Sequence, residues 1–236
     1  MCGRFTLTTD DREWLARQLG IPVEALEADR YRPRYNIAPT DLHWVLRLRR
    51  EDRELLGARW GLVNQGAPSR RRQSSQINAR SESAARAPAY RRAFARRRCA
   101  VPADGFFEWS GPARERRPHW FRRPDGGLLL FAGLYEHWTP PAGSDPAPAR
   151  ETTFTILTTA ANRTVAAVHD RMPVILPEER VDDWLFEGED DLAGLESLLE
   201  PAPDDLLVAT PVSRRVNSVR HDDPACVEPE ARQLGF

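Results

Sequence analysis

Cys2 has the most distinctive chemical position in the sequence, because removal of Met1 would make it the amino terminus. A small second residue allows that removal. The freed α-amine, with a pKa of about 7.7–8.0, and the thiol would then belong to one residue. Such a 1,2-aminothiol attacks an aldehyde twice: the amine forms an imine and the thiol closes a five-membered thiazolidine ring. The alternative is that Cys2 is only the second residue of an ordinary chain start.

Glu108 and His169 are candidate proton-transfer groups. Glu108 lies among large aromatic residues in Gly105-Phe-Phe-Glu-Trp109, where desolvation would raise its pKa toward the range useful for proton transfer. The alternative is a carboxylate on the polar face of a strand. His169, in His169-Asp-Arg-Met-Pro173, follows an expected short helix and could act as a general acid or base. The alternative is a surface or hydrogen-bonded structural histidine.

Three further residues could bind a sugar, a phosphate or a base. Asn78 and Arg80 are two positions apart, so on an extended segment their side chains point to the same side. An asparagine amide can hydrogen-bond a sugar or an amine, and an arginine guanidinium can bind a phosphate in a forked geometry. Trp60, beside Gly61, could offer a stacking face to a base, although a tryptophan belongs to the core by default.

The distribution of charge points to a phosphate surface. The 34 basic residues are all arginine, and the formal net charge is −1. Residues 69–98 hold ten arginines, among them Arg70, Arg71 and Arg72, against the single acid Glu82. Residues 177–205 hold twelve acids against Arg180 alone. The basic segment is a candidate phosphate-binding surface, and its alternative is a solvated helix face.

Composition excludes several classes of protein. The longest nearly unbroken apolar run, residues 128–135, is far shorter than the roughly 18 residues of a membrane span. No signal peptide is visible. Cys2, Cys99 and Cys226 are odd in number and far apart, which argues against a disulfide framework or a zinc cluster. We therefore expect a soluble cytoplasmic protein without a metal site and without contact with a membrane.

Apolar periodicity predicts a strand-rich fold. Residues 42–48 alternate like a strand, with 55–60 as the hairpin partner. The other expected strands are 99–101, 106–109, 119–122, 128–135, 153–158, 172–176, 206–209 and 216–219. The expected helices are a capped one between Thr8 and Gly20, one at 83–98 that Pro88 would break, one at 162–168 capped by Asn162, and two acidic ones at 178–186 and 192–199. Without regular βαβ alternation, this pattern predicts a single α+β domain over residues 1–236 with a mostly antiparallel sheet.

Taken together, these segments closely resemble the SRAP (SOS response-associated peptidase) family over nearly the whole chain. One departure is visible: after Trp60-Gly-Leu62 the family often has a proline and a second tryptophan, whereas this chain has Val63-Asn-Gln-Gly66. The matching blocks, in chain order, are Met1-Cys-Gly-Arg-Phe5, Tyr35-Asn-Ile-Ala-Pro-Thr40, Arg59-Trp-Gly-Leu62, Ile77-Asn-Ala-Arg-Ser-Glu82, Arg98–Trp109, Phe131-Ala-Gly-Leu-Tyr-Glu136, Phe154–Asn162, His169-Asp-Arg-Met-Pro173, Val216-Asn217 and Asp222-Asp-Pro224.

The resemblance implies a barrel-like antiparallel core with peripheral helices, binding of single-stranded DNA, and covalent capture of abasic sites through the N-terminal cysteine. It also implies a thiol autopeptidase activity that removes Met1. An imine intermediate would make β-elimination, and hence a side AP-lyase activity, chemically possible. No metal or organic cofactor is implied, and we expect a monomer. By position, the reactive group is Cys2, its catalytic partners are Asn78, Glu108 and His169, and the phosphate-binding arginines are Arg4, Arg80 and Arg171.

Three other functions remain open from the residues alone. The first is an N-terminal-nucleophile glutamine amidotransferase, which would also begin Met-Cys-Gly and would need an oxyanion hole. The second is a thiol peptidase that acts on other proteins through a Cys2–His169 pair. The third is a non-catalytic DNA-binding module, which would form no covalent adduct.

Overall fold

The computed structural model describes residues 2–26, 31–69, 76–112, 114–141, 150–186, 194–195 and 197–230. Its strands are β1 (Phe5–Leu7), β2 (Arg34–Ile37), β3 (Leu42–Arg49), β4 (Asp52–Trp60), β5 (Asn78–Arg80), β6 (Arg98–Ala103), β7 (Gly105–Ser110), β8 (Arg117–Arg122), β9 (Leu129–Trp138), β10 (Glu151–Ala160), β11 (Arg171–Pro173) and β12 (Val208–Pro211). Its α-helices are α1 (Arg12–Leu19), α2 (Ser81–Ala84), α3 (Arg91–Arg96), α4 (Arg163–Ala166) and α5 (Val181–Leu185). Its 3₁₀ helices are η1 (Val23–Ala25), η3 (Glu178–Arg180), η4 (Ser197–Leu199), η5 (Arg214–Asn217) and η6 (Pro224–Cys226).

Five strands close into a barrel in the order β10-β4-β3-β6-β9 and back to β10. The neighbours are antiparallel except for β10 and β4, which run parallel with Phe154 beside Trp60. The second half of β10 also pairs with β5 in parallel and with β11 in antiparallel orientation. The prediction of an α+β fold with a mostly antiparallel, barrel-like core is therefore confirmed.

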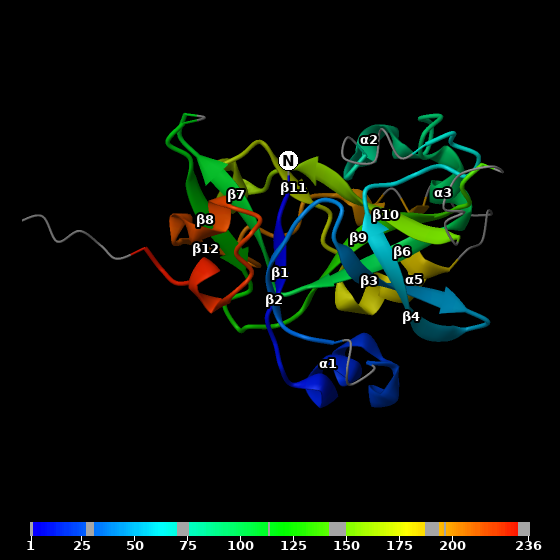
Figure 1. Cartoon of the computed structure of the whole chain (residues 1–236), viewed down its shortest axis with the longest axis horizontal. Helices are drawn as coiled ribbons and strands as arrows, with labels where there is room; N and C mark the ends of the chain where they lie inside the picture. The colour runs from blue at the N-terminus through cyan, green and yellow to red at the C-terminus, as the bar shows by residue number, and fades with distance from the viewer. Residues whose placement is uncertain are drawn as a thin grey trace, which may run out of the picture.

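The remaining strands form an antiparallel sheet in the order β12-β8-β7-β1-β2. Figure 1 shows this sheet on the left and the barrel on the right, with α1 below them and α2 and α3 above the barrel. Phe5 of β1 links the two sheets. Its ring is fully buried and makes edge contacts with Trp60 at 5.1 Å and with Phe131 at 6.1 Å between ring centroids. The first residues of the chain are therefore fixed against the barrel.

Two local signals for the helices act as predicted, and one is displaced. The cap of α1 is Asp11, one residue after the predicted Thr8-Thr9-Asp10 signal, and it accepts a hydrogen bond from the N–H of Trp14. Gly20 ends the helix as predicted, in the left-handed conformation that glycine tolerates, with φ of 66°. Asn162 caps α4 through its contact with the N–H of Val165. Helices α2 and α3 are separate, so the predicted break around Pro88 is confirmed.

Other sequence predictions need correction or fall outside the described residues. The strand expected at 216–219 is wrong: η5 occupies 214–217, with the Ser213 hydroxyl bonded to the N–H of Arg215 and only Val216 buried. The arginines at 70–72 lie outside the described residues, as do residues 192, 193 and 196 of the helix expected at 192–199, of which 197–199 form the 3₁₀ helix η4. No helix of the described part of the chain is long and apolar enough to cross a membrane.

Candidate active-site groove

The pairing of β1 with β7 places the start of the chain beside Glu108. Phe5 pairs with Phe106, and the N–H of Phe107 donates to the carbonyl oxygen of Arg4 at 3.0 Å. Continuing this antiparallel register brings Gly3 opposite Glu108. Cys2 is fully buried. Burial raises the pKa of its thiol far above the usual range, and the nearby Glu108 carboxylate raises it further.

Asn78 approaches Cys2 from the other sheet. Strand β5 pairs with β10 through Asn78 and Ile156, and the side-chain nitrogen of Asn78 donates to the carbonyl oxygen of Cys2 at 2.8 Å. The Oδ1 atom of Asn78 is buried and has no hydrogen-bond partner among the described residues. Asn78 therefore holds the backbone of Cys2 and keeps one acceptor for a further donor.

Glu108 is a buried carboxyl group. Its residue is only 3% exposed, so it does not lie on a solvated strand face. Burial raises its pKa to about 7, from a usual value of 4.5. Near neutral pH the group therefore exchanges between its acid and its carboxylate form, which is what proton transfer requires.

His169 is held as a neutral ring with a defined tautomer. Burial lowers its pKa below 6.5. The backbone N–H of Arg171 donates to Nδ1 at 3.0 Å. The carboxylate of Asp170 lies 3.0 Å from the same nitrogen, but its side chain is exposed. Because a backbone N–H can only donate, Nδ1 accepts and the ring proton is on Nε2. His169 can therefore donate a hydrogen bond from Nε2.

Glu108 and His169 line one groove of about 860 Å³, together with Gly3 and Trp109. The lining of the groove has a net positive charge. This net charge is larger when Glu108 is protonated, and about half of the Glu108 carboxyl groups are protonated near neutral pH. Its charged lining side chains are four arginines, Arg4, Arg114, Arg116 and Arg214, and two glutamates, Glu108 and Glu115. Such a lining suits an anionic polymer such as a nucleic acid.

The model of the SOS response associated peptidase (SRAP) family matches residues 1–219. The chain belongs to the SRAP family. The abasic site processing protein YoqW of Bacillus subtilis is 35% identical over 229 residues, which cover 97% of this chain and 99% of that protein. The abasic site processing protein HMCES of Gallus gallus is 32% identical over 238 residues, which cover 87% of this chain and 69% of that protein.

Solved structures share this SRAP fold. A protein from Bacteroides thetaiotaomicron superimposes with a TM-score of 0.83 at 23% identity, over 97% of this chain and 100% of that one. A protein from Bordetella bronchiseptica gives a TM-score of 0.70 at 26% identity, over 90% of this chain and 100% of that one. The barrel and the sheet beside it are thus an arrangement that solved proteins also have.

The three arginines expected to contact phosphate have different surroundings. Arg4 lies in the groove, where its Nη1 donates to Asn36 Oδ1 and to the carbonyl oxygen of Val216, both at 2.8 Å. Arg80 is exposed at the end of β5. Arg171 is 15% exposed and forms an ion pair with Glu82. Arg4 and Arg80 fit a phosphate contact, whereas the guanidinium of Arg171 is already held by a carboxylate.

Trp60 cannot stack on a base in this SRAP structure. Its ring is fully buried, parallel to that of Phe154, with Nε1 bonded to the carbonyl oxygen of Ile77 at 2.8 Å. The aromatic side chain in the groove is Trp109, whose Nε1 donates to Asn217 Oδ1 at 2.7 Å. Trp109 is thus the groove's candidate base-stacking residue, although from the sequence it is only an aromatic neighbour of Glu108.

The sequence also left other groove residues unassigned. Arg114 and Arg116 stand in a segment for which neither a helix nor a strand was predicted, and Arg214 and Asn217 belong to η5. Only their closeness in sequence, either to Glu108 or to the Val216-Asn217 block, could have indicated that these residues line the groove. At the departure from the usual SRAP pattern, Val63 is buried, and its N–H donates to Thr153 Oγ1 at 2.9 Å. The first residue after Leu62 is therefore part of the core here.

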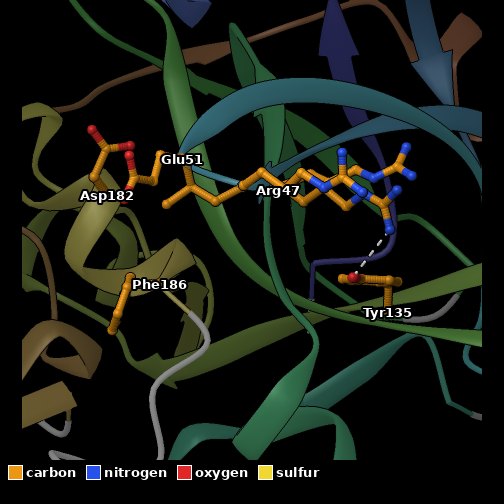
Figure 2. A pocket seen from close by; sticks show the side chains of 8 residues that line it. Arg47, Glu51, Tyr135, Asp182 and Phe186 are labelled. Carbon is orange, nitrogen blue, oxygen red and sulfur yellow. Dashed lines mark hydrogen bonds between the residues drawn. The ribbon is translucent and has the colours of Figure 1, made fainter.

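A second pocket, of about 590 Å³, lies by the β3–β4 turn and contains none of the predicted site residues. Figure 2 shows Arg47 and Tyr135 pointing toward one another, joined by a hydrogen bond of 3.3 Å, with Asp182 on the opposite side. Arg47 also pairs with Glu54, and Asp182 pairs with Arg53. These charged groups are already paired, so we place the candidate chemistry in the groove.

Proposed function

We propose that this protein captures abasic sites in single-stranded DNA by forming a covalent bond through Cys2. One observation carries the proposal: Asn78 holds the carbonyl oxygen of Cys2, the residue directly before Gly3, and Gly3 lines the groove together with Glu108 and His169. The named activity of the relatives, abasic site processing, supports the choice of substrate. The reactive group of an abasic site is the aldehyde of its ring-opened deoxyribose.

The proposed reaction begins with the neutral α-amine of Cys2, freed by loss of Met1. Its lone pair attacks the aldehyde carbon to give a carbinolamine. Glu108, with a pKa of about 7, protonates the leaving hydroxyl so that water departs, and its carboxylate then takes the proton from the nitrogen, which leaves an imine. The thiol then adds to the imine carbon, and its proton passes to the nitrogen, which closes the thiazolidine. One water is lost overall, and no oxidant or metal is required.

Asn78 and His169 position the reactants in this scheme. The buried Oδ1 of Asn78 can accept a hydrogen bond from the freed amine, which orients the lone pair toward the groove. The Nε2–H of His169 can donate to a sugar oxygen and steady the open form of the ring. The thiol stays protonated until the imine forms, because burial raises its pKa.

The DNA strand would follow the positive lining of the groove. Arg4, Arg80 and the groove arginines would contact phosphates, and Trp109 would stack on a base. The imine also makes β-elimination of the 3′ phosphate chemically accessible, so we expect some AP-lyase activity. We further propose that Cys2 takes part in removal of Met1, since a retained Met1 would block the amine.

Intact-protein mass after incubation with a single-stranded oligonucleotide that holds one abasic site tests the proposal. We expect the mass to rise by that of the oligonucleotide less one water, with no change for the undamaged strand. Absence of an adduct on protein shown to lack Met1 would contradict covalent capture and favour a non-catalytic DNA-binding module. Release of ammonia from glutamine would instead favour an amidotransferase.

A further inference from the structure

Arg4 carries a positive charge that no carboxylate contacts in the described part of the chain. Its Nη1 donates to two neutral acceptors, Asn36 Oδ1 and the carbonyl oxygen of Val216, both at 2.8 Å. Burial lowers the pKa of its guanidinium, because the charge is partly removed from water. Neither Nη2 nor Nε donates to a described residue. The guanidinium therefore keeps two donor nitrogens and an unbalanced charge for an anion that enters the groove.

The nucleophile lies beside this cation. The thiol of Cys2 donates to the carbonyl oxygen of Arg4 at 3.7 Å, and the same oxygen accepts from the N–H of Phe107 as the β1–β7 ladder continues. Residues two apart on an extended segment are separated by about 6.6 Å. A small aldose phosphate carries its aldehyde and its phosphate at opposite ends of a short carbon chain, so it is long enough to reach both residues.

The groove has the size of a small-molecule site and holds the groups that act on a sugar. Its volume of about 860 Å³ falls within the roughly 300–1,000 Å³ that such sites occupy. Glu108, His169 and Gly3 line it. The proposed capture uses only the aldehyde, the amine and thiol of Cys2 and the side chains that assist them, while the rest of a DNA strand contributes further phosphate contacts. A free aldose phosphate therefore has every group that takes part in the reaction.

We propose that the groove also captures free phosphorylated aldoses, such as 2-deoxyribose 5-phosphate, with Arg4 on the phosphate and Cys2 as the nucleophile. The inference rests on the proposed function for its covalent chemistry. The nitrogen of the amine bonds to the aldehyde carbon, whose oxygen leaves as water with the two hydrogens of the amine. The sulfur then bonds to the same carbon, the thiol proton passes to the nitrogen, and the phosphate is retained. A sugar phosphate bound in this way occupies the residue that captures abasic DNA, so the two compete.

Intact-protein mass and the rate of adduct formation test this inference on protein shown to lack Met1. We expect 2-deoxyribose 5-phosphate to raise the mass by that of the sugar phosphate less one water, and the product to lose crosslinking to abasic DNA. Every N-terminal cysteine reacts with aldehydes to some extent, so cysteinylglycine gives the intrinsic ratio of the rates with 2-deoxyribose 5-phosphate and with 2-deoxyribose. We expect this ratio to be about tenfold higher or more for the protein, since charge-assisted hydrogen bonds hold only the phosphorylated sugar.

Two further measurements assign the preference to Arg4. Arg4→Gln removes the charge but keeps an amide, so the rate ratio should fall toward that of cysteinylglycine. Arg17→Gln removes an exposed charge on α1 and should keep the wild-type ratio. Because Arg4 also contacts Asn36 and Val216, the wild type is tested in addition with inorganic phosphate as a competitor. Inorganic phosphate should lower the ratio, whereas sodium chloride at the same ionic strength should lower it less.

A wild-type ratio equal to that of cysteinylglycine would overturn the inference, and so would an unchanged ratio in Arg4→Gln. Capture of an abasic oligonucleotide without any sugar-phosphate adduct would also overturn it, while the proposed function would stand. If the protein captures the sugar phosphate with the expected preference but captures no abasic oligonucleotide, the proposed capture of DNA fails and the inference stands. The two proposals can therefore fail separately.

Discussion

The side-chain nitrogen of Asn78 lies 2.8 Å from the carbonyl oxygen of Cys2, and this contact joins a barrel-side strand to the first residues of the other sheet. It fixes the carbonyl carbon one bond from the Cα that bears the amine and the thiol. Asn78 therefore helps to orient the nucleophile by donating to the carbonyl oxygen of the same residue.

Asn78→Asp should slow crosslinking while leaving affinity for undamaged single-stranded DNA close to wild type. The variant has the same size, but its carboxylate opposes the Cys2 carbonyl and favours a protonated amine, which cannot attack. Loss of a buried hydrogen bond of this kind costs about 1–3 kcal/mol, or roughly 5- to 150-fold in rate. Single-turnover kinetics at saturating DNA measure the effect. Gln18→Glu, which adds the same charge on α1, should react at the wild-type rate.

A protein that retains Met1, or that carries an uncleavable N-terminal tag, should bind single-stranded DNA but form no heat-stable adduct. The first bond to the aldehyde is an imine, and the imine needs the free amine of Cys2. Cys2→Ser keeps that amine, so it should give only a reversible imine that borohydride traps. A denaturing gel with and without borohydride compares the proteins. A heat-stable adduct from the tagged protein would rule out the aminothiol mechanism and favour thiol-only chemistry.

The rate of crosslinking should depend on the ionisation of Glu108. Its pKa of about 7 in the folded protein means that the acid form is lost as the pH rises through 7, so the rate should fall there. Glu108→Gln should abolish this limb of the pH–rate profile and lower the rate by 10²–10⁴-fold. A wild-type rate and profile in the variant would make Glu108 structural.

The same shift predicts a pH-dependent stability. The folded pKa of Glu108 is raised, so its contribution to stability is fully present below its usual pKa of 4.5 and is lost as the pH rises through 7. Between these values the free energy of unfolding of the wild type should fall relative to Glu108→Gln, by on the order of 3 kcal/mol. Urea unfolding at pH 4.5 and pH 8 measures this difference. A constant difference between the two proteins would contradict the raised pKa.

Arg80→Ala should reduce the salt dependence of DNA binding. Arg80 is exposed beside Asn78, and each phosphate contact to a single strand contributes a slope of about −0.7 in log K against log salt. The variant should therefore lose about that much. Arg17→Ala, an exposed arginine on α1, is the control and should keep the wild-type slope. If the two slopes agree, Arg80 is not part of the phosphate surface.

The sequence predicted most strands because their buried residues either form short apolar runs, as in β6 and β9, or alternate with more exposed ones, as at the start of β3. The β3–β4 hairpin and the Asn162 cap depend on neighbouring residues, and both were predictable. Closure of the barrel was not, since the parallel pairing of Phe154 with Trp60 joins residues that are distant in the chain. No local pattern reports such a pairing.

In the candidate site, too, some residues were predictable from the sequence and others depended on the fold. Cys2 and Glu108 were predicted from the sequence, but whether Trp60 is exposed depended on which face of β4 turns inward. Its ring packs on Phe154 inside the barrel, while Trp109 faces the groove. The ion pair between Glu82 and Arg171 crosses β10, so it could be recognised only once the three strands were aligned.

The complete burial of Cys2 has a consequence for the lifetime of the protein in an oxidising cell. Peroxides and alkylating reagents react with the thiolate, and a thiol whose pKa is raised by burial forms very little of it. In the proposed reaction, the residue that captures a damaged sugar is thus kept inert toward small oxidants until it meets an aldehyde. An aldehyde avoids this protection because it reacts first with the amine.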